Sequence, residues 1–294
     1  MVSERRVIAP DGIELFVRVF GATVSPSAGD RVPVLCLPGL TRNSRDFVPL
    51  AEAVAPQRPV AAVDFRGRGY SGYDPTGDSY LPDVYASDMV AVLDELAIAK
   101  ACLIGTSLGG SVSMLVAELF VDRVAGIVLN DVGPELPTAG FARIQSYAGK
   151  LPPVATWDEA VAQLRRHAEA AAPGQSDGEW EARARQQYRE LEPGVIRPDH
   201  DPRIVAGLDA VDPTRIPDTW DRFDALLDVP MLVIRGALSD LFASSTVEEM
   251  RRRKPDLRTL EVENRGHPAT LDEPECREAI TGFLATLDPV AAAR

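Results

Sequence analysis

The chain has 294 residues and a mass of 31.8 kDa, enough to bury a large core in one α/β domain with an insertion or in two modest domains. Its 31 basic and 44 acidic residues leave a formal net charge of −13, which argues against a broad binding surface for nucleic acid or anionic membrane. Residues 1–12 lack the apolar core of a secretory signal, and no stretch reaches the length of a membrane span. We therefore expect a cytoplasmic protein.

The cysteines and histidines are too few and too scattered for a structural metal site. Cys36, Cys102 and Cys276 form no close pair, and we expect them to be small buried hydrophobic residues. The three histidines, His167, His200 and His267, form no cluster with them, so the sequence predicts no zinc site.

Apolar runs and helical periods alternate through the first part of the chain. A hairpin turning at Asp11-Gly12 is followed by a loop over 21–31 and then by helices expected at 46–55, 85–96 and 111–122. The strands expected up to this point cover 6–10, 14–20, 34–37, 60–63, 102–104 and 126–129. Such alternation predicts a mostly parallel sheet with helices on both faces, and the hairpin adds an antiparallel edge. Functional residues are then expected where strands end, at Leu40, Asp64, Ser107 and Asp131.

The alternation stops over residues 133–218, where we expect helices and no strand. Thr156-x-x-Glu159 and Ser176-x-x-Glu179 are typical capping boxes at helix starts. We interpret the segment as a helical lid inserted after the sixth strand, without a core of its own, so that residues 1–132 and 219–294 form the main domain. Its apolar residues are expected to divide between lid packing and a substrate pocket: Phe141, Ile144, Tyr147, Trp157, Trp180 and Tyr188.

The sheet resumes after residue 218 and is expected to reach eight strands. Apolar runs predict strands at 229–234 and 257–262, with helices at 244–253 and 274–287. Ser245-x-x-Glu248 predicts a capping box for the first of these helices. Asp240 and His267 follow the two strands.

A Gly-x-Ser-x-Gly sequence lies where an apolar strand meets a helix. A serine at such a sharp corner leaves no room for a Cβ at Gly105 or Gly109, and the corner exposes the Ser107 hydroxyl. It also places the Leu108 amide at a helix N-terminus, which favours a developing negative charge. A serine hydroxyl needs a neighbouring base, and the base needs an orienting carboxylate.

The order Ser107, Asp240, His267 resembles that of the α/β-hydrolase superfamily. The resemblance extends from about Arg6 to Leu287 and is to lid-bearing, carboxylesterase-like serine hydrolases. It implies an oxyanion hole formed by the amides of Leu40 and Leu108, although Pro38-Gly39-Leu40 stands where the family usually has His-Gly-x. The glycine-rich turn 64–72 is similar to a structural turn of that family and lacks a nucleotide-binding fingerprint.

Two aspartates are candidates for the acid. Asp240 follows the penultimate strand, where the family usually places the acid, and we favour it, whereas Asp131 ends the sixth strand, as in some relatives. We expect His167 to be solvated on a charged helix, and His200, in a loop, is a candidate for the pocket.

These residues predict hydrolysis of a carboxylic ester of a small to medium substrate through an acyl-enzyme, without metal or cofactor. A serine rather than an aspartate at residue 107 argues against haloalkane dehalogenase and epoxide hydrolase. Lactonase, thioesterase, amidase, carbon–carbon hydrolase and cofactor-free perhydrolase remain alternatives, as does a ligand-binding protein with little turnover. The expected partner is a small-molecule substrate and not nucleic acid or a membrane. A homodimer is an open alternative to a monomer.

Overall fold

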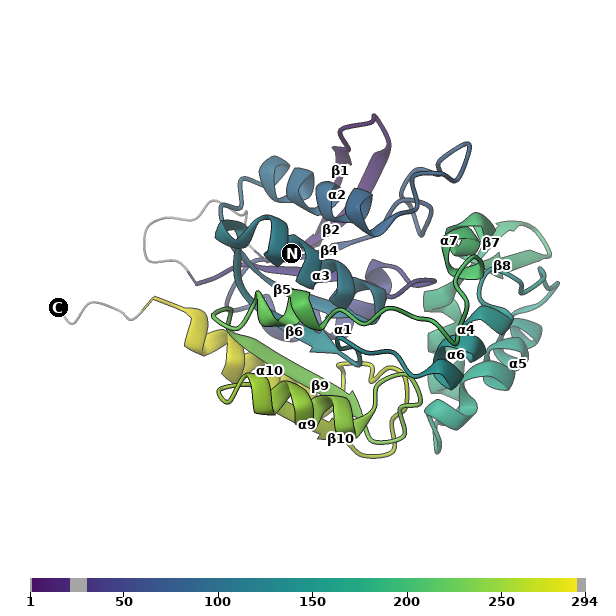
Figure 1. Ribbon diagram of the computed structural model, residues 1–294. Coiled ribbons are helices and arrows are strands. Elements are labelled where there is room, and N and C mark those ends of the chain that lie inside the picture. Colours follow the sequence, from purple (N-terminus) through teal and green to yellow (C-terminus); the bar gives the residue numbers. More distant parts are fainter. Residues whose placement is uncertain (1, 22–30, 290–294) are drawn as a thin grey trace.

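The computed structural model describes residues 2–21 and 31–289, so most of the loop expected over 21–31 lies outside the described residues. The expected mostly parallel sheet is confirmed, with eight strands in the order β1-β2-β4-β3-β5-β6-β9-β10 (Figure 1). The strands are β1 (Val2–Ile8), β2 (Glu14–Phe20), β3 (Val34–Leu37), β4 (Val60–Val63), β5 (Ala101–Thr106), β6 (Val124–Asn130), β9 (Met231–Gly236) and β10 (Arg258–Val262). The antiparallel pairs β1–β2 and β2–β4 form the expected edge.

The register of the central strands brings the site residues to one edge of the sheet. Leu37 at the end of β3 lies opposite Gly105 of β5, and Thr106 of β5 lies opposite Asn130 of β6. The parallel strands β3, β5 and β6 therefore end at nearly the same level. The residues that follow them, Gly39, Ser107 and Asp131, are consequently neighbours in space.

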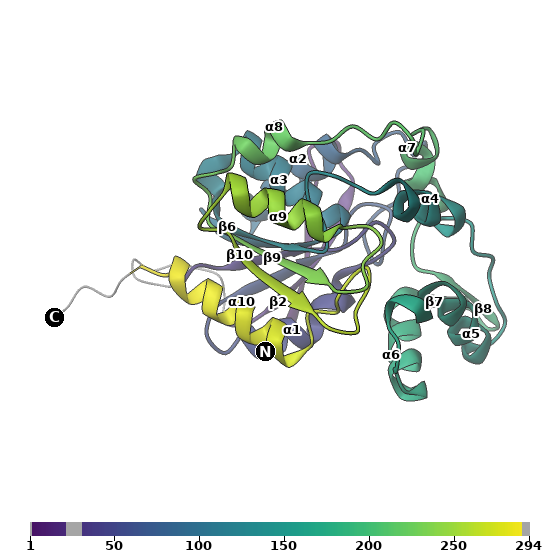
Figure 2. The same ribbon diagram turned by 60° about the horizontal axis from the view of Figure 1, so that its bottom comes forward.

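Helices cover both faces of the sheet, as the buried character of its strands predicts (Figure 2). One face is covered by α2 (Pro82–Glu95), α3 (Leu108–Leu119), α8 (Trp220–Asp224) and α9 (Ser244–Arg253). The other face is covered by α1 (Val48–Val54), preceded by the 3-10 turn η1 (Ser44–Phe47), and by α10 (Pro274–Leu287). All three cysteines are free and buried in this second core, as expected. No helix of the described residues is both long enough and apolar enough to cross a membrane.

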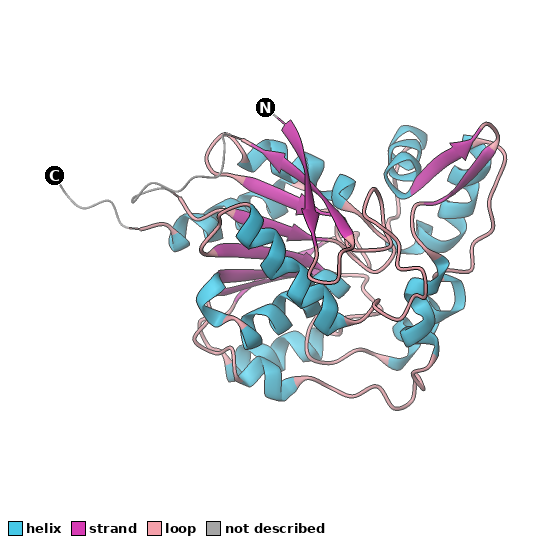
Figure 3. Ribbon diagram, turned by 90° about the horizontal axis from the view of Figure 1, so that it is seen from above, coloured by secondary structure: helices cyan, strands magenta, loops and turns pink. Residues whose placement is uncertain are grey.

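Residues 133–218 lie beyond the carboxyl ends of the parallel strands (Figures 1 and 2). The segment contains α4 (Thr138–Tyr147), α5 (Trp157–Ala168), α6 (Asp177–Gln187) and α7 (Ala206–Asp209). Both expected capping boxes open their helices, at Thr156 and Ser176. The expectation that the segment holds no strand is wrong, because β7 (Tyr188–Glu192) and β8 (Val195–Pro198) form a two-stranded sheet separate from the main one (Figure 3).

The segment also has a small apolar core, which differs from our expectation. Helices α5 and α6 pack together, and Trp180 on α6 is only 1% exposed. The buried members of this core are Ala160, Leu164, Ala172, Trp180, Ala184, Tyr188 and Ile196.

The segment is tied to the main sheet through the glycine-rich turn that follows β4. The amide of Gly69 donates to the carbonyl of Asp199 at 3.0 Å, and the amide of Asp201 donates to the carbonyl of Gly67 at 2.7 Å. Arg45 adds an ion pair with Asp199 at 2.6 Å.

The capping box expected at Ser245 is wrong. Helix α9 begins at Ser244, as expected, so its N-cap is Ala243 rather than Ser245, and no side-chain cap hydrogen bond is present. Because Ser245 falls inside the first turn, its hydroxyl has no N-cap role.

Candidate active site

Ser107 is held in a strained backbone conformation between β5 and α3. Its φ of 52° and ψ of −117° are rare for a residue with a side chain. A Cβ at Gly105 would lie 2.3 Å from the carbonyl oxygen of Gly109, and one at Gly109 would lie 2.0 Å from that of Leu37. Only glycine fits at either position, as the sequence predicts, and the corner presents the Ser107 side chain to a cavity.

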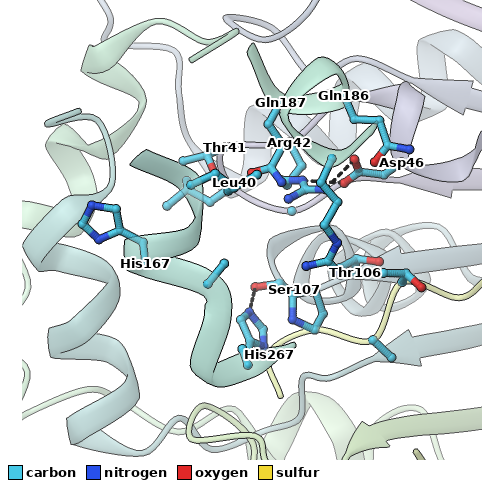
Figure 4. A pocket seen from close by; sticks show the side chains of 18 of the residues that line it. Leu40, Thr41, Arg42, Asp46, Thr106, Ser107, His167, Gln186, Gln187 and His267 are labelled. Atoms are coloured by element: carbon cyan, nitrogen blue, oxygen red, sulfur yellow. Dashed lines mark hydrogen bonds and ion pairs between the residues drawn. The ribbon is translucent and has the colours of Figure 1, made fainter. Parts of the chain in front are cut away.

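Ser107, His267 and Asp131 form a continuous chain of hydrogen bonds. Nε2 of His267 lies 2.9 Å from Oγ of Ser107 (Figure 4), and Nδ1 of His267 lies 2.7 Å from Oδ2 of Asp131. Asp131 is fully buried, accepts from the Gly236 amide at 2.9 Å and accepts from Ser239 Oγ at 2.6 Å. These donors fix its carboxylate at the end of β6 and aim one oxygen at the imidazole.

Asp240, the favoured acid, does not contact His267. The turn after β9 carries it to the surface, where both of its carboxylate oxygens bind Arg143 of α4 at 2.5 and 2.8 Å. The same guanidinium holds the pKa of Asp240 below its usual range. Gly140 of α4 packs against the backbone of Asp240, so a Cβ there would lie 2.3 Å from its carbonyl oxygen. The structure thus brings the alternative acid, Asp131, to the histidine, because the end of β6 is adjacent to Ser107.

The two amides expected to bind an oxyanion belong to the loop after β3 and to the start of α3. Leu40 lines the cavity after β3, and Leu108 is the first residue of α3. Neither amide donates to an acceptor among the described residues, which leaves both available to a ligand. The buried guanidinium of Arg68 donates through Nε to the Leu40 carbonyl at 2.8 Å and through Nη1 to Tyr85 Oη at 2.7 Å. Arg68 of the glycine-rich turn therefore positions the Leu40 loop, a role that the sequence of the turn does not indicate.

A cavity of about 460 Å³ opens over Ser107 and His267, between the sheet edge and residues 133–218. Of the expected pocket residues, Ile144, Tyr147 and His200 line it. Phe141 and Trp157 are not among its lining residues, and this differs from our expectation. Phe141 belongs to the first turn of α4, which packs against the loop at Asp240, and Trp157 packs on the core of the segment.

The two other histidines both line the cavity but in different environments. His167 is exposed, as expected, and stacks on Tyr147 with ring centroids 5.2 Å apart. His200 is 6% exposed, and burial lowers its pKa from 6.5 to about 4, helped by the nearby positive charge of Arg68. The imidazole of His200 is therefore neutral at physiological pH.

Charged residues of the cavity wall were missed by sequence reasoning. They include Arg42, Arg183 and Arg265, which come from three separate parts of the chain. In Figure 4, Arg42 pairs with Asp46 beside Gln186 and Gln187, while His167 lies on the opposite wall and the Ser107–His267 pair lies between them. The polar residues at 179, 183, 186 and 187 are spaced three and four apart, so they lie on one side of α6, and this spacing is the sequence signal for a polar cavity wall. The described residues contain no group of three or more His, Cys, Asp or Glu that could hold a metal ion.

Comparison with known proteins decides the family. Residues 34–277 match the alpha/beta hydrolase family. The chain belongs to the alpha/beta hydrolase family. This matched range spans β3 to α10 and includes Ser107, Asp131 and His267.

This alpha/beta hydrolase is similar to several named hydrolases. It is 32% identical over 256 residues to a 3-hydroxybutyrate-oligomer hydrolase of Cupriavidus necator, covering 82% of this chain and 84% of that protein. It is 28% identical over 240 residues to an esterase of Mycobacterium tuberculosis, covering 78% and 75% of the two chains. A crystal structure of an alpha/beta hydrolase from Novosphingobium aromaticivorans superposes with a TM-score of 0.89 at 37% identity, covering 97% and 98%. The family and these names support a general hydrolytic function.

Proposed function

We propose that this alpha/beta hydrolase cleaves carboxylic esters of small to medium size, with Ser107 as nucleophile, His267 as base and Asp131 as acid. The observation that carries the proposal is the hydrogen-bond chain Ser107–His267–Asp131, with distances of 2.9 and 2.7 Å, at the floor of the cavity. The name of the esterase relative supports an ester as the bond cleaved.

The proposed reaction begins with transfer of the Ser107 proton to Nε2 of His267 as Oγ attacks the ester carbonyl. The amides of Leu40 and Leu108 stabilise the tetrahedral oxyanion, and the buried Asp131 carboxylate stabilises the imidazolium. His267 then protonates the leaving alcohol, which yields an acyl-enzyme. A water molecule activated by His267 releases the acid and restores Ser107.

Residues 133–218 act in this proposal as a lid that encloses the substrate. Ile144 and Tyr147 of α4 and several residues of α6 supply cavity wall opposite Ser107. The segment therefore determines the size and polarity of the substrate, whereas the sheet edge supplies the chemistry.

The test is a panel of 4-nitrophenyl esters from acetate to octanoate, together with lactones, thioesters and amides. Ser107→Ala is expected to abolish turnover, whereas Ser111→Ala, one turn further along α3 and outside the cavity wall, retains it. A fluorophosphonate probe should add to the peptide that contains Ser107 in the wild type. Ester turnover that survives in Ser107→Ala would contradict the proposal. Preferential turnover of lactones, thioesters or amides would replace the ester assignment and leave the nucleophile in place.

A further inference from the structure

Helix α6 turns a polar face toward the cavity. Glu179, Ala182, Arg183, Gln186 and Gln187 line the cavity, and their spacing of three and four residues places them on one side of the helix. The other side carries Trp180 and Ala184, which are buried in the core of residues 133–218. A cavity wall built only to pack an alkyl chain would not need this polar stripe.

Besides Arg143, which pairs with Asp240, three arginines line the cavity, and two of these three are neutralised. Both carboxylate oxygens of Asp46 bind Arg42, at 2.6 and 2.7 Å. Arg265 donates through Nε to Oε1 of Glu273 at 2.7 Å. These carboxylates account for two of the three positive charges.

Arg183 is the arginine that remains. It is half-buried and forms no salt bridge with any described residue, while its guanidinium carbon lies 5.7 Å from the ring centroid of Trp180. Burial, and then the positive charge of Arg42, lower the pKa of Arg183 to about 10. The guanidinium therefore stays protonated at neutral pH but is poorly compensated for its lost hydration.

The other carboxylates near the cavity do not neutralise the guanidinium of Arg183. Glu179 and Asp272 also line it, but both are exposed, and Oε2 of Glu179 accepts from Ser176 in the capping box. Solvent and salt screen exposed charges. Oε2 of Glu273 has no hydrogen-bond partner among the described residues, yet Arg183 is not within salt-bridge distance of it.

We propose that Arg183 binds a carboxylate of the substrate, and that the substrate is an ester that carries a free carboxylate besides the bond that is cleaved. A guanidinium matches a carboxylate with two parallel hydrogen bonds, and the partial exclusion of water strengthens the pair. Gln186 and Gln187, one turn further along the same face, are placed to donate to the same group or to a neighbouring hydroxyl. The inference rests on the proposed ester hydrolysis at Ser107, because both groups face one cavity.

The test compares esters that differ in one carboxylate. For the acyl side, 4-nitrophenyl hydrogen glutarate is compared with 4-nitrophenyl pentanoate. For the alcohol side, 3-acetoxybutanoate is compared with 2-pentyl acetate, and the release of acetate is followed. The readout is the ratio of kcat/KM for the charged ester to kcat/KM for the neutral one.

The variants are Arg183→Met, which removes the charge, and Arg183→Lys, which keeps the charge but loses the planar fork. Arg183→Met should lower the ratio about 30-fold or more in at least one pair, mainly through KM, because a desolvated charge loses its partner. Arg183→Lys should restore part of the ratio. Arg185→Met is the matched control, since Arg185 lies on the same helix, is exposed and stacks on Trp157 away from the cavity wall. An unchanged ratio in both pairs for Arg183→Met would overturn the inference.

Binding measurements separate this inference from the proposed function. Calorimetric titration with glutarate needs no turnover, and we expect Arg183→Met to weaken its binding while Arg185→Met does not. If no ester is cleaved but glutarate binding depends on Arg183, the ester proposal fails and the carboxylate subsite stands. If Arg183→Met does not fold, as judged by its melting transition, the test uses the kcat/KM ratios and glutarate affinities of Arg183→Lys and the wild type. A wild type that neither binds glutarate nor prefers a charged ester would overturn the inference.

Discussion

Replacing Asp131 by Asn should disable the enzyme, whereas the same change at Asp240 should not. Asp131 is fully buried and its carboxylate lies 2.7 Å from Nδ1 of His267. Asparagine keeps the size of the side chain but removes the negative charge that stabilises an imidazolium, and its amide group can hold the ring in the wrong tautomer. Asp240 is exposed and binds Arg143 instead.

The expected magnitudes differ by several orders. For Asp131→Asn we expect a fall in kcat of about 10³- to 10⁴-fold, or about 4 to 5 kcal/mol of transition-state stabilisation. For Asp240→Asn the loss is that of one exposed ion pair, about 0.2 to 1 kcal/mol of folding stability, with kcat within about threefold of wild type.

The assay is burst and steady-state release of 4-nitrophenol from the best ester of the panel, at matched active-site concentrations. Because Asp131 also accepts from Gly236 and Ser239, the melting temperature of Asp131→Asn must be measured to exclude unfolding as the cause. Near-wild-type kcat in Asp131→Asn together with a thousandfold loss in Asp240→Asn would refute the reasoning and return the acid role to Asp240.

Three further changes test the fold around the site. Gly109→Ala should lower both the melting temperature and ester turnover, because the added Cβ would lie 2.0 Å from the Leu37 carbonyl oxygen. The control is Gly178→Ala, which should change neither quantity, because no atom lies within 4 Å of a Cβ at that position. Trp180→Ala should cost about 3 to 5 kcal/mol of unfolding free energy in urea melts, and an unchanged midpoint would contradict the burial of the ring. The pKa of His200 is about 4 in the folded protein and 6.5 in the unfolded chain. Between these values only the unfolded chain binds the proton, so the free energy of unfolding is highest above pH 6.5 and falls as the pH is lowered to about 4. Across that window the wild type should lose about 3 kcal/mol more than His200→Gln in urea melts, and parallel pH curves would show that His200 is not held neutral.

The centre of the main sheet could be predicted because its strands β3, β4 and β5 are buried along their whole length. Val34–Leu37 and Val60–Val63 are wholly apolar runs, and the structure places strands at those residues. Strand β7 is largely charged and exposed, so it carries no such signal. Pro193-Gly194, with a φ of +76° at Gly194, forms the turn between β7 and β8 and is the sequence signal for this hairpin.

The choice between Asp131 and Asp240 shows what strand order leaves undecided. Both residues follow a strand that ends at the same edge of the sheet, and both precede His267 in the sequence. The difference arises from the turn after β9, whose path depends on packing against α4. That contact joins residues about a hundred positions apart in the chain, so periodicity and motif spacing do not report it.

Substrate choice is even harder to predict from periodicity and motif spacing, because it also depends on contacts between distant parts of the chain. The proposed nucleophile and the proposed oxyanion amides lie at strand ends, where local sequence signals are strong, so motifs can indicate them. Arg183 faces the cavity only because α6 buries Trp180 on its other side, which turns the polar side of the helix toward Ser107. Its proposed role in binding a carboxylate depends on this packing. An arginine on an exposed helix has the same sequence context but is hydrated, and it binds a carboxylate weakly. We therefore expect specificity to depend on how residues 133–218 pack over the sheet edge, and variants of α6 should change the preferred substrate without changing the reaction.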